Sequence, residues 1–273
     1  MTNLRVLSMG WGRQTWTLAA MMALGELPRV DFIVHADTTH EMAGTYEFRR
    51  KWEPWLGEHG LTVATVQGKR PDVVRPDVVR PDYADQVMIP AFTLGRADAK
   101  EGQAQRQCTN DWKIQPIRRF IRAELDRRGV TLAKGVVESW QGISFDESYR
   151  ARDSDVDYIT NVYPLLERRL KVADCIAWLR ANGLDIPPKS ACTFCPFHSL
   201  AHWRRIKRRG GADWREAIAV DGAIREKRRE HITFVHPRRK PLARAVVIPE
   251  DFGASQSTLF GEENACDSGY CMT

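Results

Sequence analysis

The sequence predicts a doubly wound, mostly parallel α/β sheet, because strand-like and helix-like segments alternate from its beginning. The stretch Leu4–Leu24 contains a short apolar run, a Gly-containing turn and an Ala-, Leu- and Met-rich segment of high helix propensity. The continuous apolar segment Val30–Ala36 and the segment Leu61–Gln67 predict two more strands, separated by a helix over Met42–His59. The order is therefore β-α-β-α-β within the first 70 residues.

The composition is ordinary for a globular protein and favours an anionic ligand. Of the 273 residues, 43% are hydrophobic and 28% are charged. The net charge of +6 suits nucleotides and nucleic acid without selecting one of them. No apolar run approaches the ~18 residues of a membrane span, and the first residues lead straight into a strand. We therefore expect a cytoplasmic protein without a membrane partner.

The turn between the first strand and the first helix is a candidate anion site. The start of a helix presents backbone N–H groups and a positive dipole, and Gly10 and Gly12 allow a phosphate to approach the backbone. The hydroxyls of Ser8, Thr15 and Thr17 can also donate. The turn lacks both the Gly-Lys-Ser/Thr ending of a Walker A loop and the third glycine of a dinucleotide fingerprint. A tight strand-to-helix connection without a ligand remains the alternative.

Asp37 follows the second predicted strand, where open parallel sheets bind ligands. It is therefore a site candidate, and capping of the next helix is the alternative. Farther on, the Pro-rich stretch Lys69–Asp85 predicts a surface loop, and an amphipathic basic helix is expected around Ile114–Arg127. A strand ending at Gly142 and an extended piece over Tyr158–Leu166 follow.

The C-terminal part is expected to be helical and to contain a cysteine site. Helices are predicted over Val172–Asn182, His202–Arg209 and Asp213–Glu230, followed by an extended ITFVHPRRKPL segment. We expect three parts, namely a nucleotide-binding α/β domain over 1–168, a helical Cys-x-x-Cys region over 169–250, and a flexible tail over 251–273.

Six cysteines in a chain expected inside the cell indicate metal ligands or redox groups rather than disulfides. Cys192 and Cys195 form a Cys-x-x-Cys pair, and Cys108 and Cys175 are available to complete a metal or iron–sulfur site. Cys175 is equally well explained as a buried thiol of its helix. Cys266 and Cys271 in the tail are interpreted as exposed thiols or as a sulfur-relaying pair.

Several stretches together resemble one known family. VLSMGWGRQTWTL is similar to the PP-loop of the adenine nucleotide α-hydrolase superfamily, in the version of the PAPS reductase-like proteins of phages and bacteria. The resemblance continues through HADTTHE, RQCTNDWKIQPI, GISFDESYR, DCIAWLRANG, PPKSACTFCPF and FVHPRRKPL, so it spans nearly the whole chain. The sequence departs from the family at Trp11, where the family has Gly, at Thr15, where it has Ser, and at Trp16, where a small residue is usual.

The resemblance implies a Rossmann-like fold that binds ATP, or a related adenine nucleotide, with Mg²⁺. The residues that it assigns to the phosphates are Ser8, Gly10, Gly12, Gln14 and Thr15. It assigns Asp37 to the nucleotide edge or its Mg²⁺, and Asp37 and Arg150 are the candidate catalytic residues.

The resemblance also implies a reaction. In PP-loop enzymes that modify nucleobases or DNA, ATP adenylates a substrate oxygen, pyrophosphate leaves, and sulfur or nitrogen displaces the adenylated oxygen. Relatives that transfer sulfur often hold a 4Fe-4S cluster, for which the matching positions here are Cys108, Cys175, Cys192 and Cys195. The leading hypothesis is an iron–sulfur sulfurtransferase that acts on a nucleic acid or nucleotide and receives sulfur from a donor protein. The basic surface expected to serve it comprises Arg118, Arg119, Arg122, Arg204, Arg205, Lys207, Arg208 and Arg209.

Two alternatives remain. The protein can be a thiol-dependent PAPS or APS reductase, with Cys266 or Cys271 as the nucleophile that attacks the sulfonate sulfur. It can also be a non-catalytic nucleic-acid-binding protein with a structural Zn²⁺ at the same four cysteines.

Overall fold

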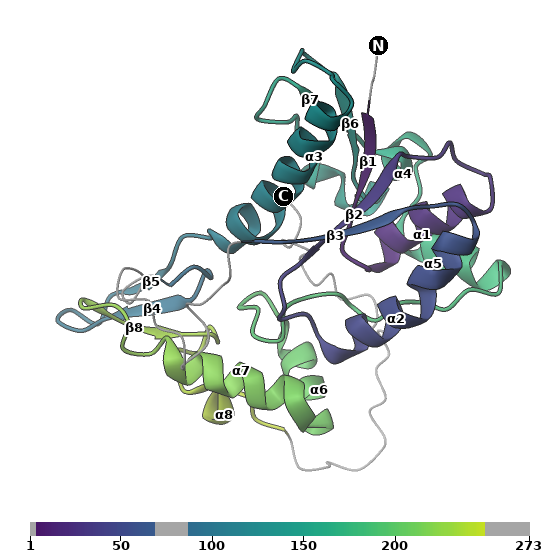
Figure 1. Cartoon of the computed structure of the whole chain (residues 1–273). Coiled ribbons are helices and arrows are strands. Elements are labelled where there is room, and N and C mark those ends of the chain that lie inside the picture. Colours follow the sequence, from purple (N-terminus) through teal and green to yellow (C-terminus); the bar gives the residue numbers. More distant parts are fainter. Residues whose placement is uncertain (1–3, 69–86, 249–273) are drawn as a thin grey trace. The chain divides into compact units, whose positions relative to one another are not determined.

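A computed structural model describes residues 4–68 and 87–248 of the chain (Figure 1). The chain divides into two compact units, and each unit draws on two separate stretches of the sequence. The first unit is Met1–Lys69 with Asp111–Ser190, and the second is Arg70–Asn110 with Ala191–Thr273. The expected loop over 69–85 and the expected tail over 251–273, with Cys266 and Cys271, lie outside the described residues.

The first unit is built on a parallel sheet of five strands in the order β3-β2-β1-β6-β7, which confirms the predicted fold class. The strands are β1 (Leu4–Met9), β2 (Phe32–Asp37), β3 (Val63–Gln67), β6 (Val137–Trp140) and β7 (Ile159–Val162). The chain adds β2 and β3 on one side of β1, and then β6 and β7 on the other side. The strand order therefore reverses beside β1, and ligands of such sheets bind at the carboxyl ends of the strands at this point.

Helices cover both faces of this sheet. The helices of the first unit are α1 (Arg13–Ala23), α2 (Ala43–Glu58), α3 (Gln115–Arg127), α4 (Pro164–Glu167) and α5 (Val172–Ala181). Leu7 and Met9 of β1 pack in the same apolar cluster as α1, α2, α4 and α5. Leu4 and Val6 pack with Ile121 of α3, because successive strand residues point to opposite faces.

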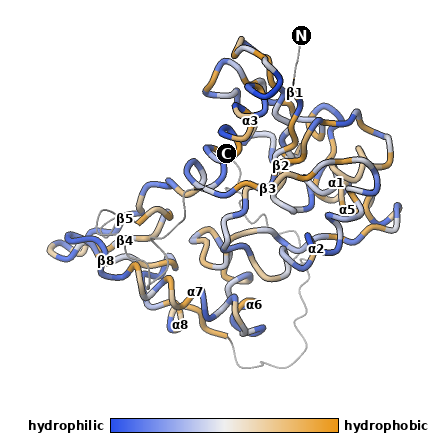
Figure 2. Tube along the Cα trace, viewed as in Figure 1, coloured by the Kyte–Doolittle hydropathy of each residue, from blue (hydrophilic) through white to orange (hydrophobic). Residues whose placement is uncertain are grey.

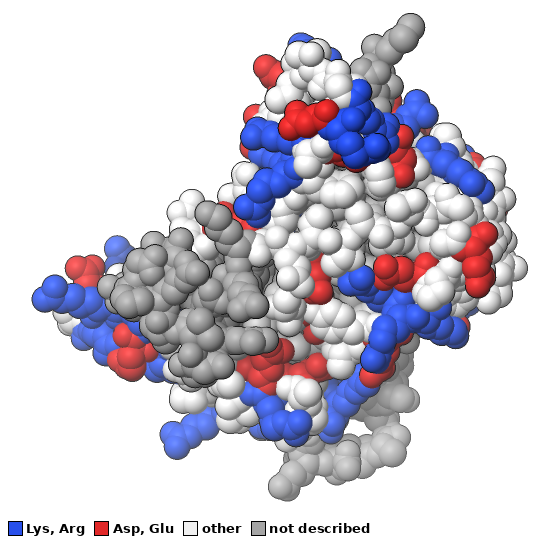
Figure 3. Space-filling view, viewed as in Figure 1, with Lys and Arg blue, Asp and Glu red and all other residues white. Residues whose placement is uncertain are grey.

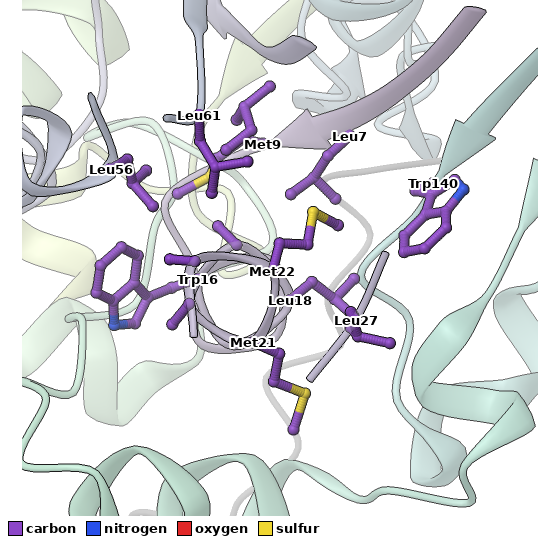
Figure 4. Packing of buried hydrophobic residues seen from close by; sticks show 14 of the residues in the cluster. Leu7, Met9, Trp16, Leu18, Met21, Met22, Leu27, Leu56, Leu61 and Trp140 are labelled. Carbon is purple, nitrogen blue, oxygen red and sulfur yellow. The ribbon is translucent and has the colours of Figure 1, made fainter. Parts of the chain in front are cut away.

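The core beneath one face surrounds α1, whose residues from Thr15 to Ala23 are all buried (Figure 4). The Trp16 ring lies 5.4 Å from Phe48, 5.2 Å from Trp52 and 5.8 Å from Trp55, centroid to centroid, so α2 supplies an aromatic cluster around it. This cluster explains why a large residue occupies position 16. Figure 2 shows the hydrophobic residues concentrated along the strands of the parallel sheet and along α1.

The second unit contains a small antiparallel sheet in the order β5-β4-β8 together with three helices. Its elements are β4 (Phe92–Gly95), β5 (Glu101–Gln103), α6 (Leu200–Arg209), α7 (Gly211–Ala223), β8 (His231–Phe234) and α8 (Leu242–Ala245). The buried carboxylate of Asp221 in α7 accepts hydrogen bonds from the backbone N–H groups of Val235 and Leu242, at 2.9 Å each, and pairs with Arg225. This carboxylate therefore joins three elements of the unit.

Several boundaries differ from those that the sequence predicts. The first unit extends past residue 168, because Cys175 and Leu179 of α5 lie in the core around α1. The piece expected to be extended over Tyr158–Leu166 ends in helix α4, which begins at Pro164. Helix α7 stops at Ala223, because the next carbonyls accept hydrogen bonds from Thr233 as the chain turns back into β8. None of the helices in the described residues is long and apolar enough to cross a membrane.

Candidate functional site

The predicted anion site is the turn between β1 and α1. Gly12 precedes α1 with an extended backbone, and no side chain among the described residues caps this helix. The first turn of α1 contains no acidic residue. The first N–H groups of α1 are therefore left for a ligand, and the helix dipole favours a negative charge at this end.

The predicted hydroxyl donors of the turn have partners of their own. Thr15 donates to the carbonyl of Gly12 at 3.3 Å, and Thr17 donates to the carbonyl of Arg13 at 2.8 Å. Ser8 accepts a hydrogen bond from Gln141 at 3.4 Å. Thr17 is fully buried, so its hydroxyl serves the helix rather than an anion.

Trp11 lies in the core beneath the turn. Its indole is fully buried, with the ring centroid 6.3 Å from that of Trp16 and 6.4 Å from that of His35. Its φ of 55° is a value that glycine adopts without strain, whereas a bulky residue at this φ costs about 1–2 kcal/mol. His35 donates its Nδ1–H to the carbonyl of Met9 at 3.0 Å, and burial lowers the pKa of its imidazole. The site therefore keeps a glycine-like backbone at position 11 while the side chain packs inward.

Two more segments of the first unit meet at the start of α1. A Cβ atom on Gly142 would lie 2.6 Å from Cγ2 of Thr15 and 2.9 Å from its backbone nitrogen. A Cβ atom on Gly12 would lie 2.9 Å from Oγ of Ser190. The chain after β6 and the chain after α5 thus both border the turn. The sequence predicts Gly142 only as the end of a strand, and it does not indicate that Ser190 borders the turn.

A buried charged group lies against the first turn of α1. The 3₁₀ helix η3 (Phe145–Arg150) carries Glu147, which accepts hydrogen bonds from Gln14 at 3.1 Å and from Arg150 at 2.6 Å. Glu147 and Arg150 are 7% and 8% exposed. Nε of Arg150 has no hydrogen-bond partner among the described residues. A buried guanidinium on the segment that contacts the first turn of α1 is suited to an anion bound at the turn.

Glu147 connects two predicted site residues, Gln14 and Arg150, and it was not itself predicted as a site residue. The Glu147–Arg150 spacing of three residues is typical of an ion pair within a helical segment and was the available signal.

Asp37 is fixed at the carboxyl end of β2. Its Oδ1 accepts hydrogen bonds at 2.8 Å from the backbone N–H of Thr39 and from the hydroxyl of Tyr46. Burial, reinforced by Asp37, raises the pKa of the Tyr46 hydroxyl. The residue before α2 is Met42, so Asp37 closes its own turn and does not cap that helix.

A second ion pair at the same end of β2 was not predicted. Glu41, with a side chain 3% exposed, lies 3.5 Å from Nζ of Lys113 and accepts a hydrogen bond from Thr38 at 3.4 Å. Lys113 belongs to the π-helical turn Asn110–Ile114 that precedes α3. The ion pair therefore attaches this turn to the end of β2.

The four predicted ligand cysteines are divided between the two units. Cys175 is fully buried in the core around α1, and burial raises the pKa of its thiol to about 11. Cys108, Cys192 and Cys195 belong to the second unit. Within the described ranges, no group of three or more His, Cys, Asp or Glu side chains is arranged to hold a metal ion. The four-cysteine set stays a prediction, and Cys175 is the member enclosed in the core of the first unit.

The three cysteines of the second unit lie on segments that contact each other. Cys195 donates its backbone N–H to the carbonyl of Cys192 at 3.1 Å, and His198 donates its Nε2–H to the same carbonyl at 2.9 Å. The guanidinium of Arg106 lies 5.6 Å from the ring centroid of Phe197. The segment with Cys108 is thereby held against the Cys-x-x-Cys segment.

The predicted basic surface contains both structural and exposed cations, and Figure 3 shows basic side chains gathered over α3. In α3, Arg118 pairs with Asp155, and Arg122 donates to the hydroxyl of Tyr158 at 3.3 Å. In α6, Arg204 donates to the carbonyl of Val247 at 3.1 Å, and Lys207 donates to the carbonyls of Ala243 and Val246. The exposed members, which form no ion pair with the described residues, are Arg119, Arg205, Arg208 and Arg209.

Two enzymes are among the solved structures that align with the chain. The phosphoadenylyl-sulfate (PAPS) reductase from Candida auris, in a phosphate complex, is 14% identical with a TM-score of 0.41, and the alignment covers 68% of this chain and 76% of that chain. The U34-tRNA thiolase NcsA from Methanococcus maripaludis, with its [4Fe-4S] cluster, is 10% identical with a TM-score of 0.36, covering 83% and 72%. No protein-family model matches the sequence, and no curated protein matches it significantly.

Proposed function

We propose that the chain is a PP-loop ATP-dependent adenylating enzyme that transfers sulfur to a nucleic acid or nucleotide. The observation that carries this proposal is the uncapped start of α1, bordered by Gly142 and contacted through Gln14 by the buried Glu147–Arg150 pair. The PP-loop resemblance of the sequence supports the same function.

The described groups have distinct roles in this proposal. The N–H groups at the start of α1 and the amide of Gln14 bind the phosphates of ATP, and Asp37 holds the Mg²⁺ or the nucleotide edge. An oxygen of the substrate attacks the α-phosphorus, the bond to the β-phosphate oxygen breaks, and pyrophosphate leaves with the electron pair. The guanidinium of Arg150 stabilises the negative charge that develops on the phosphates. Sulfur from a donor then displaces AMP from the adenylated carbon.

The metal proposal narrows to Cys108, Cys192 and Cys195, the three cysteines that belong to the second unit. These three thiolates would hold a 4Fe-4S cluster if their side chains turned toward one another, and the cluster would supply an iron that can carry sulfide. Iron and sulfide analysis of protein purified without oxygen tests this set. We expect Cys175→Ala to keep the iron content of the parent and Cys192→Ser to lower it. Stoichiometric zinc in a colourless protein would instead support the binding-protein alternative.

The adenylation step is tested by pyrophosphate release. The anaerobically prepared protein, with ATP, Mg²⁺ and sulfide as the sulfur donor, is supplied with total RNA or with DNA, and we expect pyrophosphate and AMP to form in equal amounts. Arg150→Ala should slow release by about 100-fold or more, as loss of a positioned charge does. Arg180→Ala, which removes an exposed arginine of α5, is the matched control. Absence of both products with every nucleic acid would refute the proposal.

A further inference from the structure

Two exposed aromatic side chains lie on one short segment of the first unit. Phe145 is 42% exposed and Tyr149 is 62% exposed, and both belong to η3. The other large apolar side chains that are exposed in the described part of the chain are aliphatic, namely Leu24, Leu132, Ile218 and Val247. Large apolar side chains are informative where several are exposed close together, and both rings belong to one six-residue segment.

Hydrogen bonds attach η3 to the rest of the first unit. Its buried residues Glu147 and Arg150 form the ion pair that reaches Gln14 in the first turn of α1. At its beginning, the backbone N–H of Phe145 donates to the carbonyl of Leu170 at 2.8 Å. The segment that carries the two rings is thus attached to α1 through Glu147, where its backbone is kinked, and to Leu170 through Phe145. A ligand that stacks on an attached segment loses little by ordering it.

The strand order indicates which reactant meets these rings. Helix η3 follows β6, whereas Asp37 ends β2, and these strands lie on opposite sides of β1. In the proposed function the nucleotide extends from the turn after β1 toward Asp37. The side of β6 is then left for the acceptor.

We propose that Phe145 and Tyr149 form a stacking platform for an unpaired base of the nucleic-acid acceptor. This inference rests on the proposed function and names its acceptor as a single-stranded or unpaired region. Every base has an aromatic face, and stacking on a protein aromatic ring contributes about 1–3 kcal/mol per base. The exposed rings supply the stacking faces, and the buried Glu147–Arg150 pair fixes their position.

The test compares two strands without ATP. A short fluorescent oligothymidylate is measured beside a strand of the same length and backbone that carries abasic sites. We expect the parent protein to bind the strand with bases about tenfold or more tightly, the equivalent of ~1.4 kcal/mol. Phe145→Ala/Tyr149→Ala should bind both strands with the affinity that the parent shows for the abasic strand. Phe145→Tyr/Tyr149→Phe should restore the preference for bases, and Leu132→Ala/Ile218→Ala should leave it unchanged.

Three results would overturn the inference. An unchanged preference in the double alanine variant would show that the rings do not stack on the strand. An equal loss for both strands would show a general effect of the substitutions on the surface. In a separate titration with a non-hydrolysable ATP analogue, a loss of affinity for the analogue alone would assign the rings to adenine. Because binding is measured without ATP, these outcomes are independent of pyrophosphate release, which tests adenylation separately.

Discussion

The backbone of Gly142 lies so close to Thr15 that there is no room for a side chain at position 142. We expect Gly142→Ala to destabilise the protein by about 1–3 kcal/mol in urea unfolding, because the new methyl group overlaps Thr15 at 2.6 Å. The same overlap should displace the start of α1 and weaken the binding of an ATP analogue. Gly57→Ala is the control, since its Cβ would meet no atom within 4 Å inside α2. That control should be neutral or stabilising by up to ~1 kcal/mol.

Cys175 gives the protein a specific sensitivity to alkali. Its thiol pKa is about 11 in the folded protein, because burial disfavours the thiolate, against 9.0 for an ordinary thiol. The unfolded chain therefore loses this proton at lower pH, and the stability from the neutral thiol disappears as the pH rises from 9 to 11. We expect a loss of about 3 kcal/mol that Cys175→Ala does not show.

The measurement for Cys175 is the free energy of unfolding against pH for both proteins. Tyr46 has a raised pKa in each of them, so the difference between the two curves isolates the cysteine. Parallel curves between pH 9 and pH 11 would contradict the burial of a neutral thiol.

At the scale of elements, Asp221 holds α7, β8 and α8 of the second unit together. We expect Asp221→Ala to cost about 3–5 kcal/mol in urea unfolding, because it leaves a partly buried arginine and two backbone N–H groups without their acceptor. Glu226→Ala is the matched control, since Glu226 pairs with Arg96 at the surface and is 66% exposed. Its loss should cost less than ~1 kcal/mol. Similar losses in the two variants would contradict this role.

Helix α6 carries two kinds of basic side chain, namely those that hydrogen-bond within the fold and those that are exposed and can bind a polyanion. Arg204 and Lys207 hold the chain around α8, whereas Arg205, Arg208 and Arg209 are exposed. We expect Arg205→Ala/Arg208→Ala/Arg209→Ala to lower the slope of log Kd against log salt for oligothymidylate by about 2, since each phosphate contact on a single strand contributes ~0.7. A matched triple variant at exposed arginines elsewhere, Arg50→Ala/Arg180→Ala/Arg229→Ala, should keep the slope of the parent. Equal slopes in all three proteins would show that α6 makes no phosphate contacts.

At the scale of the whole molecule, the two units should respond separately to nucleotide. A non-hydrolysable ATP analogue with Mg²⁺, at about 100 times its Kd, should stabilise the first unit by ~2.7 kcal/mol. Amide hydrogen exchange should slow in β1, α1 and η3 and stay unchanged in β4, β5 and β8. Equal protection of both sheets would show that they unfold as one unit.

The sequence predicts the elements whose signal is local. The apolar runs of β1, β2 and β3 and the periodic pattern of α1, α2 and α5 can be read without knowing the fold. By contrast, β4 and β5 are too short for such a signal, and pairing with a distant strand defines them. The division into two units has the same origin, because it depends on contacts between distant segments.

The residues of the candidate site likewise include some with a local sequence signal and some that only contacts between distant segments reveal. Gln14, Asp37 and Arg150 stand in recognisable motifs, whereas Glu147 becomes a site residue only when η3 meets α1. Cys175 is consistent in sequence with both a ligand and a core thiol, and only the packing of α5 on α1 selects the core.

The sheet of the second unit pairs strands that are far apart in the sequence and are therefore synthesised at different times. β4 pairs with β8, with Phe92 opposite Phe234, so the middle strand of this sheet has an open edge until β8 has been synthesised. Contacts between such distant residues slow folding, and an unpaired strand edge is a site at which chains associate. Growing chains therefore carry an aggregation hazard at β4 that the finished protein covers with β8.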